Sequence, residues 1–215
     1  MVRNCGTVGD LRARLLCGER DALVELFDEH RARLRQIVHF RLDPRVSARV
    51  DPDDVLQDAF LDASLRLAHY RDETQFSPFV WLRLIVSQTL IDVHRRHLGA
   101  QQRAAGREFN FCNGALSSGV SVSIAAHFIA HWTSPSQTAM RSELGAKLRN
   151  AINNMEPFDR EVLALRHFEE LTNKEVAELL QIGEKAASIR YVRAIARLKN
   201  ILVNMPEFSA LYPVG

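Results

Sequence analysis

Residues 171–202 (LTNKEVAELLQIGEKAASIRYVRAIARLKNIL) have the pattern of two helices joined by a tight turn. Thr172 is a good N-cap residue, and Glu175 stands three positions later, which is the spacing of a capping box. The first helix is short and ends at 181–183, Gln-Ile-Gly, and a longer basic helix begins near Glu184. A short capped helix, a turn that contains glycine and a longer basic helix predict a helix-turn-helix.

The second helix of this motif combines an apolar stripe with a basic surface. The residues that recur at helical intervals, and that are predicted to be buried, are Ala187, Tyr191, Ala194, Leu198 and Leu202. The cations are Lys185, Arg190, Arg193, Arg197 and Lys199, against the single acid Glu184. Such clustering is expected of an element that contacts phosphates, and the alternative is an ordinary amphipathic surface helix.

Three residues of the same helix fall outside the buried stripe and carry no charge. They are Ser188, Ile189 and Val192. Small apolar side chains that are exposed on a basic helix can contact thymine methyl groups in a major groove. We therefore expect this set to face the bases.

Net charge limits how the chain can bind nucleic acid. The 28 Lys and Arg residues nearly balance the 26 Asp and Glu residues, so the net charge is only +2. Any affinity for nucleic acid must then come from local patches, because a nonspecific DNA-coating protein would carry more positive charge.

The cysteine count and the hydropathy pattern indicate a soluble cytoplasmic protein. Cys5, Cys17 and Cys112 have no paired spacing, and their odd number favours reduced thiols. The first residues lack the apolar core of a signal peptide, and no stretch approaches the roughly 20 apolar residues that span a bilayer. We expect no membrane insertion.

One helix of the N-terminal half is acidic. It is predicted to begin with Asp51 as N-cap and Pro52 at the first helical position. Residues 51–65 contain five Asp and no Lys or Arg, and a helical wheel groups four residues on one side: Asp54, Gln57, Asp58 and Leu61. The helix dipole accounts for acids in the first turn but not for later ones or for an outward leucine. A protein-docking face is the second interpretation.

The next helix, residues 79–97, is apolar around most of its circumference and ends in the basic cluster 94–97, His-Arg-Arg-His. Four aromatic residues precede or open it: Tyr70, Phe76, Phe79 and Trp81. Aromatic side chains before a basic helix end are the components of a platform for single-stranded nucleic acid. Burial in the core is the alternative, and partial burial is our expectation for Trp81.

The sequence predicts an all-α protein with two helical domains joined by a flexible linker. The domains are residues 1–100 and 141–215, and the C-terminal one has four helices. Residues 101–140 are rich in Ser, Gly and Ala and are predicted to be linker, with at most a short helix near residues 124–131. His127, His131 and Cys112 in this stretch are too scattered for a metal site. We expect no metal and no cofactor.

Two segments carry a resemblance to a known family. Residues 51–96 contain an acidic DD-x-x-QD-x-F run and an F-x-W-L start to the last helix, and residues 144–202 end in the helix-turn-helix. In this order and at this separation they are similar to regions 2 and 4 of the extracytoplasmic-function (group 4) RNA polymerase sigma factors. Residues 133–136 and 187–194 look most like planctomycete-type members.

The resemblance implies roles that spacing alone does not give. It places Asp53, Asp54, Gln57, Asp58 and Leu61 against the clamp helices of core RNA polymerase. It assigns the minus-ten promoter element to Asp72, Thr74, Phe76, Trp81, Arg83, Gln88, Arg95 and Arg96. It assigns the minus-thirty-five element to Lys185, Ser188, Ile189, Arg190, Val192, Arg193 and Arg197. The polymerase flap is a further expected contact of the C-terminal domain, and an anti-sigma factor is an optional partner.

The sequence departs from the family where the recognition helix begins. Gly183 replaces the usual serine, and Ser188, Ile189 and Ile195 stand where many members carry basic or polar residues. A promoter sequence therefore cannot be transferred from other members. A stand-alone regulator that binds duplex operators as a dimer is the alternative function. An enzyme is not expected, because the sequence contains neither a Gly-rich phosphate loop nor a nucleophile elbow.

Overall fold

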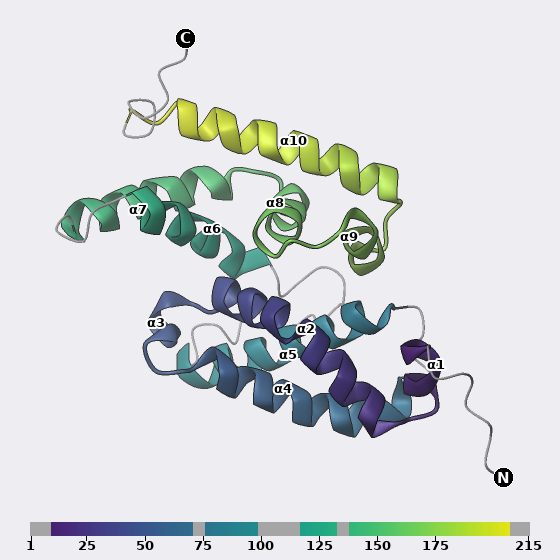
Figure 1. The fold of residues 1–215 in the computed structure, drawn as a ribbon. Coiled ribbons are helices and arrows are strands. Elements are labelled where there is room, and N and C mark those ends of the chain that lie inside the picture. Colours follow the sequence, from purple (N-terminus) through teal and green to yellow (C-terminus); the bar gives the residue numbers. More distant parts are fainter. Residues whose placement is uncertain (1–9, 71–75, 99–116, 133–137, 207–215) are drawn as a thin grey trace. The chain divides into compact units, whose positions relative to one another are not determined.

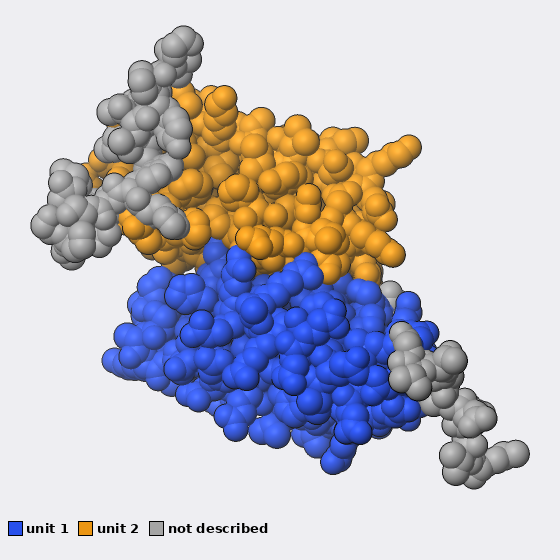
Figure 2. Space-filling view, viewed as in Figure 1, with its two compact units in different colours: residues 1–102 blue, residues 103–215 orange. Residues whose placement is uncertain are grey.

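The computed structural model describes residues 10–70, 76–98, 117–132 and 138–206. All elements in these ranges are helical, which confirms the predicted all-α class. The chain divides into two compact units, residues 1–102 (unit 1) and residues 103–215 (unit 2), which Figure 2 shows in different colours.

Unit 1 is a helical bundle in which the predicted caps are present. Its elements are α1 (Leu11–Leu16), α2 (Arg20–Arg41), α3 (Pro44–Ser47), α4 (Pro52–Arg66), the 3-10 turn η1 (Leu67–His69) and α5 (Pro78–Leu98). The Asp51 carboxylate accepts a hydrogen bond from the backbone N–H of Asp53 at 2.9 Å, and Pro52 occupies the first turn of α4. Both features were predicted, whereas the short helix α3 was not.

The core of unit 1 lies where α2, α4 and α5 pack on one another (Figure 1). Each contributes a stripe of apolar side chains: Leu23, Leu26, Leu34 and Ile37 from α2, Val55, Leu56, Ala59 and Ala63 from α4, and Val80, Trp81, Leu82 and Val86 from α5. Because α5 contacts both other helices, it is buried along much of its length, as its continuous apolar sequence predicted.

Unit 2 contains the helices α6 (Ser117–Trp132), α7 (Thr138–Asn153), α8 (Pro157–Leu163), α9 (Asn173–Leu180) and α10 (Glu184–Val203). A π-helical turn, η3 (Ala164–Phe168), continues α8. Helix α10 packs on α8 and α9, and α6 lies beside α7 (Figure 1).

Helix α6 lies in the segment that was expected to be linker. It is 16 residues long, and it packs on α7 and α8. Val120, Ile124 and Ala125 are buried there. The Ser, Gly and Ala content that suggests a linker also permits close helix packing, and the few large apolar residues supply the buried face. Unit 2 is therefore larger than the predicted domain of residues 141–215.

The helix-turn-helix is present as predicted. Thr172 Oγ1 accepts a hydrogen bond from the Glu175 N–H at 3.2 Å, and the Glu175 carboxylate accepts one from the Thr172 N–H at 2.7 Å, which confirms the capping box. Gln181, at the end of α9, is in the left-handed region with φ 53°. The Asn173 side chain donates to the carbonyl of Glu184 at 2.8 Å and so joins the first turns of the two helices.

Two further expectations concerned the compartment. None of the helices in the described ranges is both long and apolar enough to cross a membrane. Cys17 is disulfide-bonded, contrary to the expectation of reduced thiols. An odd count of three cysteines leaves room for one pair beside one thiol, so the count alone does not decide the redox state.

Candidate nucleic-acid interface

Helix α10 is held in unit 2 by a narrow buried stripe. Ala187, Ala194 and Leu198 are buried, as the helical spacing predicted. Tyr191 and Leu202 belong to the same predicted stripe but are only half-buried. The prediction of complete burial is therefore wrong for these two, because the stripe is formed mainly by small residues and larger side chains reach its edge.

Tyr191 instead lies at the margin between α10 and η3. Its hydroxyl is 3.5 Å from Nδ1 of His167, and the guanidinium of Arg166 lies 5.2 Å from its ring centroid. An aromatic side chain with a polar tip is suited to such a margin, since its ring packs while its hydroxyl remains near the surface.

The side of α10 opposite the buried stripe is open. Ile189 is 63% exposed and Val192 is 65% exposed, and Ser188 and Lys185 beside them are also exposed. The three residues that were expected to face the bases thus lie on one side of the helix, together with the cation Lys185. The two large apolar side chains therefore lie in solvent among cations.

Arg190 does not project from this surface. Its Nη1 donates to Oδ1 of Asp159 at 3.0 Å and lies 3.4 Å from Oε2 of Glu156. The guanidinium also lies 4.5 Å from the ring centroid of Phe158. Three contacts from the first turn of α8 therefore hold a side chain that was predicted to contact DNA. The buried carboxylate of Asp159 carried no sequence signal that pointed to this role.

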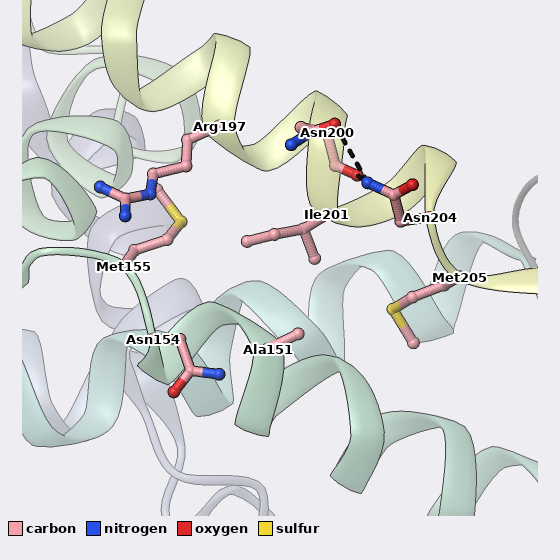
Figure 3. Close-up of a pocket in the computed structure, with 8 residues that line it drawn as sticks. All are labelled: Ala151, Asn154, Met155, Arg197, Asn200, Ile201, Asn204 and Met205. Carbon is pink, nitrogen blue, oxygen red and sulfur yellow. Dashed lines mark hydrogen bonds between the residues drawn. The ribbon is translucent and has the colours of Figure 1, made fainter.

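Arg193 and Arg197 are both exposed but have different neighbours. Nε of Arg193 lies 3.8 Å from Oδ2 of Asp159, yet its side chain is mostly exposed. Arg197 is exposed and lines a pocket of about 360 Å³ between α7 and α10, with Met155 and Met205 among the other lining residues. Figure 3 shows the Arg197 side chain beside Met155. It therefore flanks the open surface and is not central to it.

Helix α4 exposes the acidic face that the sequence predicted. Asp54, Gln57 and Asp58 are exposed, and Leu61 is 56% exposed on the same helix. Leu65, one turn further on, is 78% exposed and extends the apolar part of this face. The sequence interpretation missed Leu65, although its spacing of four from Leu61 could have revealed it. We call these five residues the acidic face.

Asp53, which directly precedes this face, is held by two arginines. Its carboxylate accepts hydrogen bonds from Nε of Arg35 at 3.1 Å and from Nη2 of Arg31 at 3.3 Å, and both arginines belong to α2. The hydrogen bond from Arg35, and then that from Arg31, lowers the pKa of Asp53. Its role in this structure is to join α4 to α2.

Three residues expected at the minus-ten element are buried in unit 1. Trp81 is 1% exposed and packs edge-on against Tyr70 with 4.8 Å between ring centroids. Arg83 is fully buried and donates to Ser87 Oγ at 3.5 Å, and Phe76 is also buried. They face the neighbouring helices, so as placed they present no surface to DNA. Trp81 is therefore a core residue, and the expectation that it is only partially buried is wrong.

Three further minus-ten residues, Gln88, Arg95 and Arg96, lie on the second half of α5. Gln88 donates to Asp92 at 3.3 Å, and Nη1 of Arg95 lies 3.4 Å from the same carboxylate. Arg96 is exposed, and its Nη2 lies 3.8 Å from Oδ2 of Asp58. This basic helix end is therefore accessible. Asp72 and Thr74 lie outside the described residues.

His94 in the basic cluster has a structural role. Its Nε2 accepts a hydrogen bond from the backbone N–H of Asp43 at 3.1 Å, which connects α5 to the cap of α3. Burial lowers the pKa of the His94 imidazole. An uncharged ring is required here, since a protonated nitrogen could not accept this bond.

Metal coordination finds no support in the part of the chain that the structure describes, where no group of three His, Cys, Asp or Glu side chains converges. His127, one of the residues considered above, lies against the ring of Phe168 with 5.0 Å between centroids.

The helical fold and the basic second helix of the motif define a helix-turn-helix protein of the nucleic-acid-binding class. Residues 26–99 match the family model described as sigma-70 region 2, and residues 145–198 match that described as sigma-70 region 4, together more than half of the chain. The chain belongs to the sigma-70 family and is an RNA polymerase sigma factor with the region 2 and region 4 pairing of the extracytoplasmic-function group. Its partners are accordingly core RNA polymerase and promoter DNA.

Among solved structures, the chain is similar to one described as the structure of CnrH in complex with the cytosolic domain of CnrY. The TM-score is 0.49 at 22% sequence identity, over 89% of this chain and 94% of that chain. No curated protein matches the chain.

Proposed function

We propose that this sigma factor docks on the clamp helices of core RNA polymerase through the acidic face of α4. The observation that carries the proposal is the exposure of Leu61 and Leu65 on the same side of α4 as Asp54, whose carboxylate has no ion-pair partner among the described residues. Leucines in water beside uncompensated charge favour a partner that covers them and supplies cations. Asp53 acts indirectly, because Arg31 and Arg35 fix it and so fix the start of α4.

The minus-ten element is assigned to the end of α5 and the residues before it. Arg95 and Arg96 are exposed there and are suited to phosphate contacts. Trp81 and Arg83 support this surface from within the core of unit 1. Opening the duplex costs a few kcal/mol for each unstacked base, which a pocket for the extruded base must offset.

The minus-thirty-five element is assigned to α10. Lys185, Arg193 and Arg197 are its exposed cations among the predicted contacts. Since a single helix-turn-helix without a dimer partner contacts few base pairs, α10 needs the second attachment that polymerase provides. The polymerase flap is proposed as a further contact of unit 2.

Reconstituted transcription tests the proposal. Start sites mapped after overexpression would supply promoters, and the purified chain would be added to core polymerase on those templates. Transcripts that begin at the mapped sites only when the chain is present are the expected result. Transcription from the same sites by core polymerase alone, or none with the chain, would contradict it.

A further inference from the structure

The open surface of α10 has an apolar centre and a charged margin. Ile189 and Val192 are three residues apart, so they lie on one side of the helix, directly opposite the buried Ala187 and Ala194. Lys185 precedes them by one turn, and Arg193 lies on their flank. Whatever binds here must offer apolar groups at its centre and negative charge around them.

The structure also holds Arg190 away from this surface, where its guanidinium could otherwise bind guanine. Arginine is the side chain that most often reads guanine, by two parallel hydrogen bonds to O6 and N7. Arg190 directly follows Ile189 in the sequence, but Asp159, Glu156 and Phe158 hold it against α8. Its donors are therefore directed away from the open surface.

Asp159 can hold Arg190 because its own position is fixed. The carboxylate is nearly inaccessible to solvent, and it also lies 3.8 Å from Nε of Arg193. An ion pair with one buried partner is screened less by water and salt than an exposed pair. Release of Arg190 would leave the Asp159 carboxylate buried with Arg193 as its remaining cation, which is costly.

We propose that α10 reads thymine methyl groups through Ile189 and Val192, and that Asp159 is a positioning residue that withholds Arg190 from the bases. The inference rests on the proposed minus-thirty-five function and specifies the chemistry of that site. Thymine is the only base with a methyl group in the major groove, and apolar side chains are its usual partners. Negative charge around the methyl groups comes from the phosphates, which the flanking cations match.

A selection experiment with the holoenzyme tests the proposal. The full chain with core polymerase would select duplexes from a library that is randomised only in the upstream promoter element. Each thymine of the enriched motif would then be replaced by deoxyuridine, which removes the methyl group and leaves the base-pairing edge unchanged. Loss of one buried methyl group is expected to weaken holoenzyme binding about fourfold.

A second experiment tests whether Ile189 and Val192 are the side chains that contact the methyl group. In a chain with Ile189→Ala and Val192→Ala, the change to deoxyuridine should have little further effect, because the partner of the methyl group is already gone. Both side chains are exposed, so the variant should fold normally. Val24→Ala, a change at an exposed valine of α2, is the matched control and should retain the full deoxyuridine effect.

The positioning role of Asp159 is tested by the DNA motif that a variant selects. With Asp159→Asn the selected motif should gain guanine, because Arg190 becomes free to reach the bases. A selection result identical to wild type, from a variant whose thermal melting shows that it is folded, would overturn this role. If Asp159→Asn does not fold, Arg190→Gln serves instead, and it should leave the wild-type motif unchanged.

The possible failures are distinguishable. An enriched motif that is insensitive to deoxyuridine, or equally sensitive in the alanine variant, overturns the methyl-reading proposal alone. A library with no enriched upstream motif overturns the minus-thirty-five function as well. If the alanine variant binds DNA normally but loses affinity for core polymerase, the apolar pair contacts protein and the proposal is wrong.

Discussion

Arg96 Nη2 lies 3.8 Å from Asp58 Oδ2, so the basic end of α5 and the acidic face of α4 share an ion pair. Both side chains are more than half exposed, and such a pair contributes little to stability. It does place a proposed DNA-contacting cation beside a proposed polymerase-contacting acid. Binding of polymerase at Asp58 would therefore release Arg96 for phosphate contact.

Charge reversal on the acidic face should abolish polymerase binding. We expect that the chain with Asp54→Lys and Asp58→Lys no longer co-elutes with core polymerase in gel filtration, because cations would meet the cations of the partner. Asp21→Lys with Glu29→Lys makes the same charge change at exposed acids of α2 and should co-elute normally. Normal co-elution of the first variant would refute the docking face.

The exposed leucines of the same face should matter as much as its charge. Leu61→Ala is expected to weaken binding to core polymerase by roughly tenfold, since burying a leucine side chain is worth about 1.5–3 kcal/mol. Leu65→Ala should act in the same direction. A fluorescence titration measures both, with Val24→Ala as the control at another exposed apolar residue. Equal affinities for all three variants would argue that no partner covers α4.

The helix-turn-helix of this chain lacks one stabilising bond that a single change can restore. Gly183 is the N-cap of α10, has no side chain to cap it, and has φ −69° and open space around it. Gly183→Ser should raise the free energy of unfolding by a few tenths of a kcal/mol, whereas Thr172→Ala should lower it by about 1 kcal/mol. Urea unfolding of the full chain measures both, and opposite signs are the decisive result.

Unit 1 should lose stability as the pH falls below 7. The His94 imidazole has a lowered pKa in the folded state because it is buried, while the unfolded ring titrates near its ordinary value of about 6.5. The unfolded state therefore binds more protons below that pH, and acid favours unfolding. Full stability is present above about pH 6.5 and is lost as the pH falls through the folded pKa.

Chemical unfolding at pH 7 and pH 5 checks this dependence, with His94→Gln as the comparison. A glutamine oxygen can accept a hydrogen bond from the Asp43 N–H and does not titrate. The variant should lose less stability than wild type between the two pH values. The pKa of Asp43 is also lowered, chiefly by its hydrogen bond with Arg45, but its contribution falls near or below pH 4 and so outside this window.

Removal of one flanking cation should separate DNA recognition from polymerase binding. Arg193→Ala is expected to reduce transcription from mapped promoters while co-elution with core polymerase stays unchanged, because α10 is remote in sequence from the acidic face. Arg149→Ala removes an exposed cation of α7 and serves as the control. If Arg193→Ala transcribes as wild type does, the assignment of this flank to DNA is wrong.

Local sequence patterns predicted the features that depend on neighbouring residues. The capping box of Thr172 and Glu175 and the cap of α4 at Asp51 involve residues two or three apart, so spacing is enough to find them. The exposed side of α10 followed from helical periodicity in the same way. The family itself followed from two such motifs in the right order.

Local sequence patterns could not predict contacts between residues that are far apart in the chain. Asp159 and Arg190 are 31 positions apart, and nothing in the local sequence pairs them. The burial of Arg83 among apolar neighbours and the packing of α6 in unit 2 have the same cause. In each case a polar or small residue suggested surface or linker, and only the packing of distant helices decided the outcome.

The hydrogen bond from Asn173 to the Glu184 carbonyl has a consequence for how α10 meets DNA. Helix α9 is joined to α10 at both its ends, by this bond at its start and by the turn after Gln181 at its finish. The two helices are thus fixed relative to one another and do not form a hinge. The angle between α9 and α10 is then set when the chain folds, so α10 would enter the proposed groove together with α9 as one rigid unit.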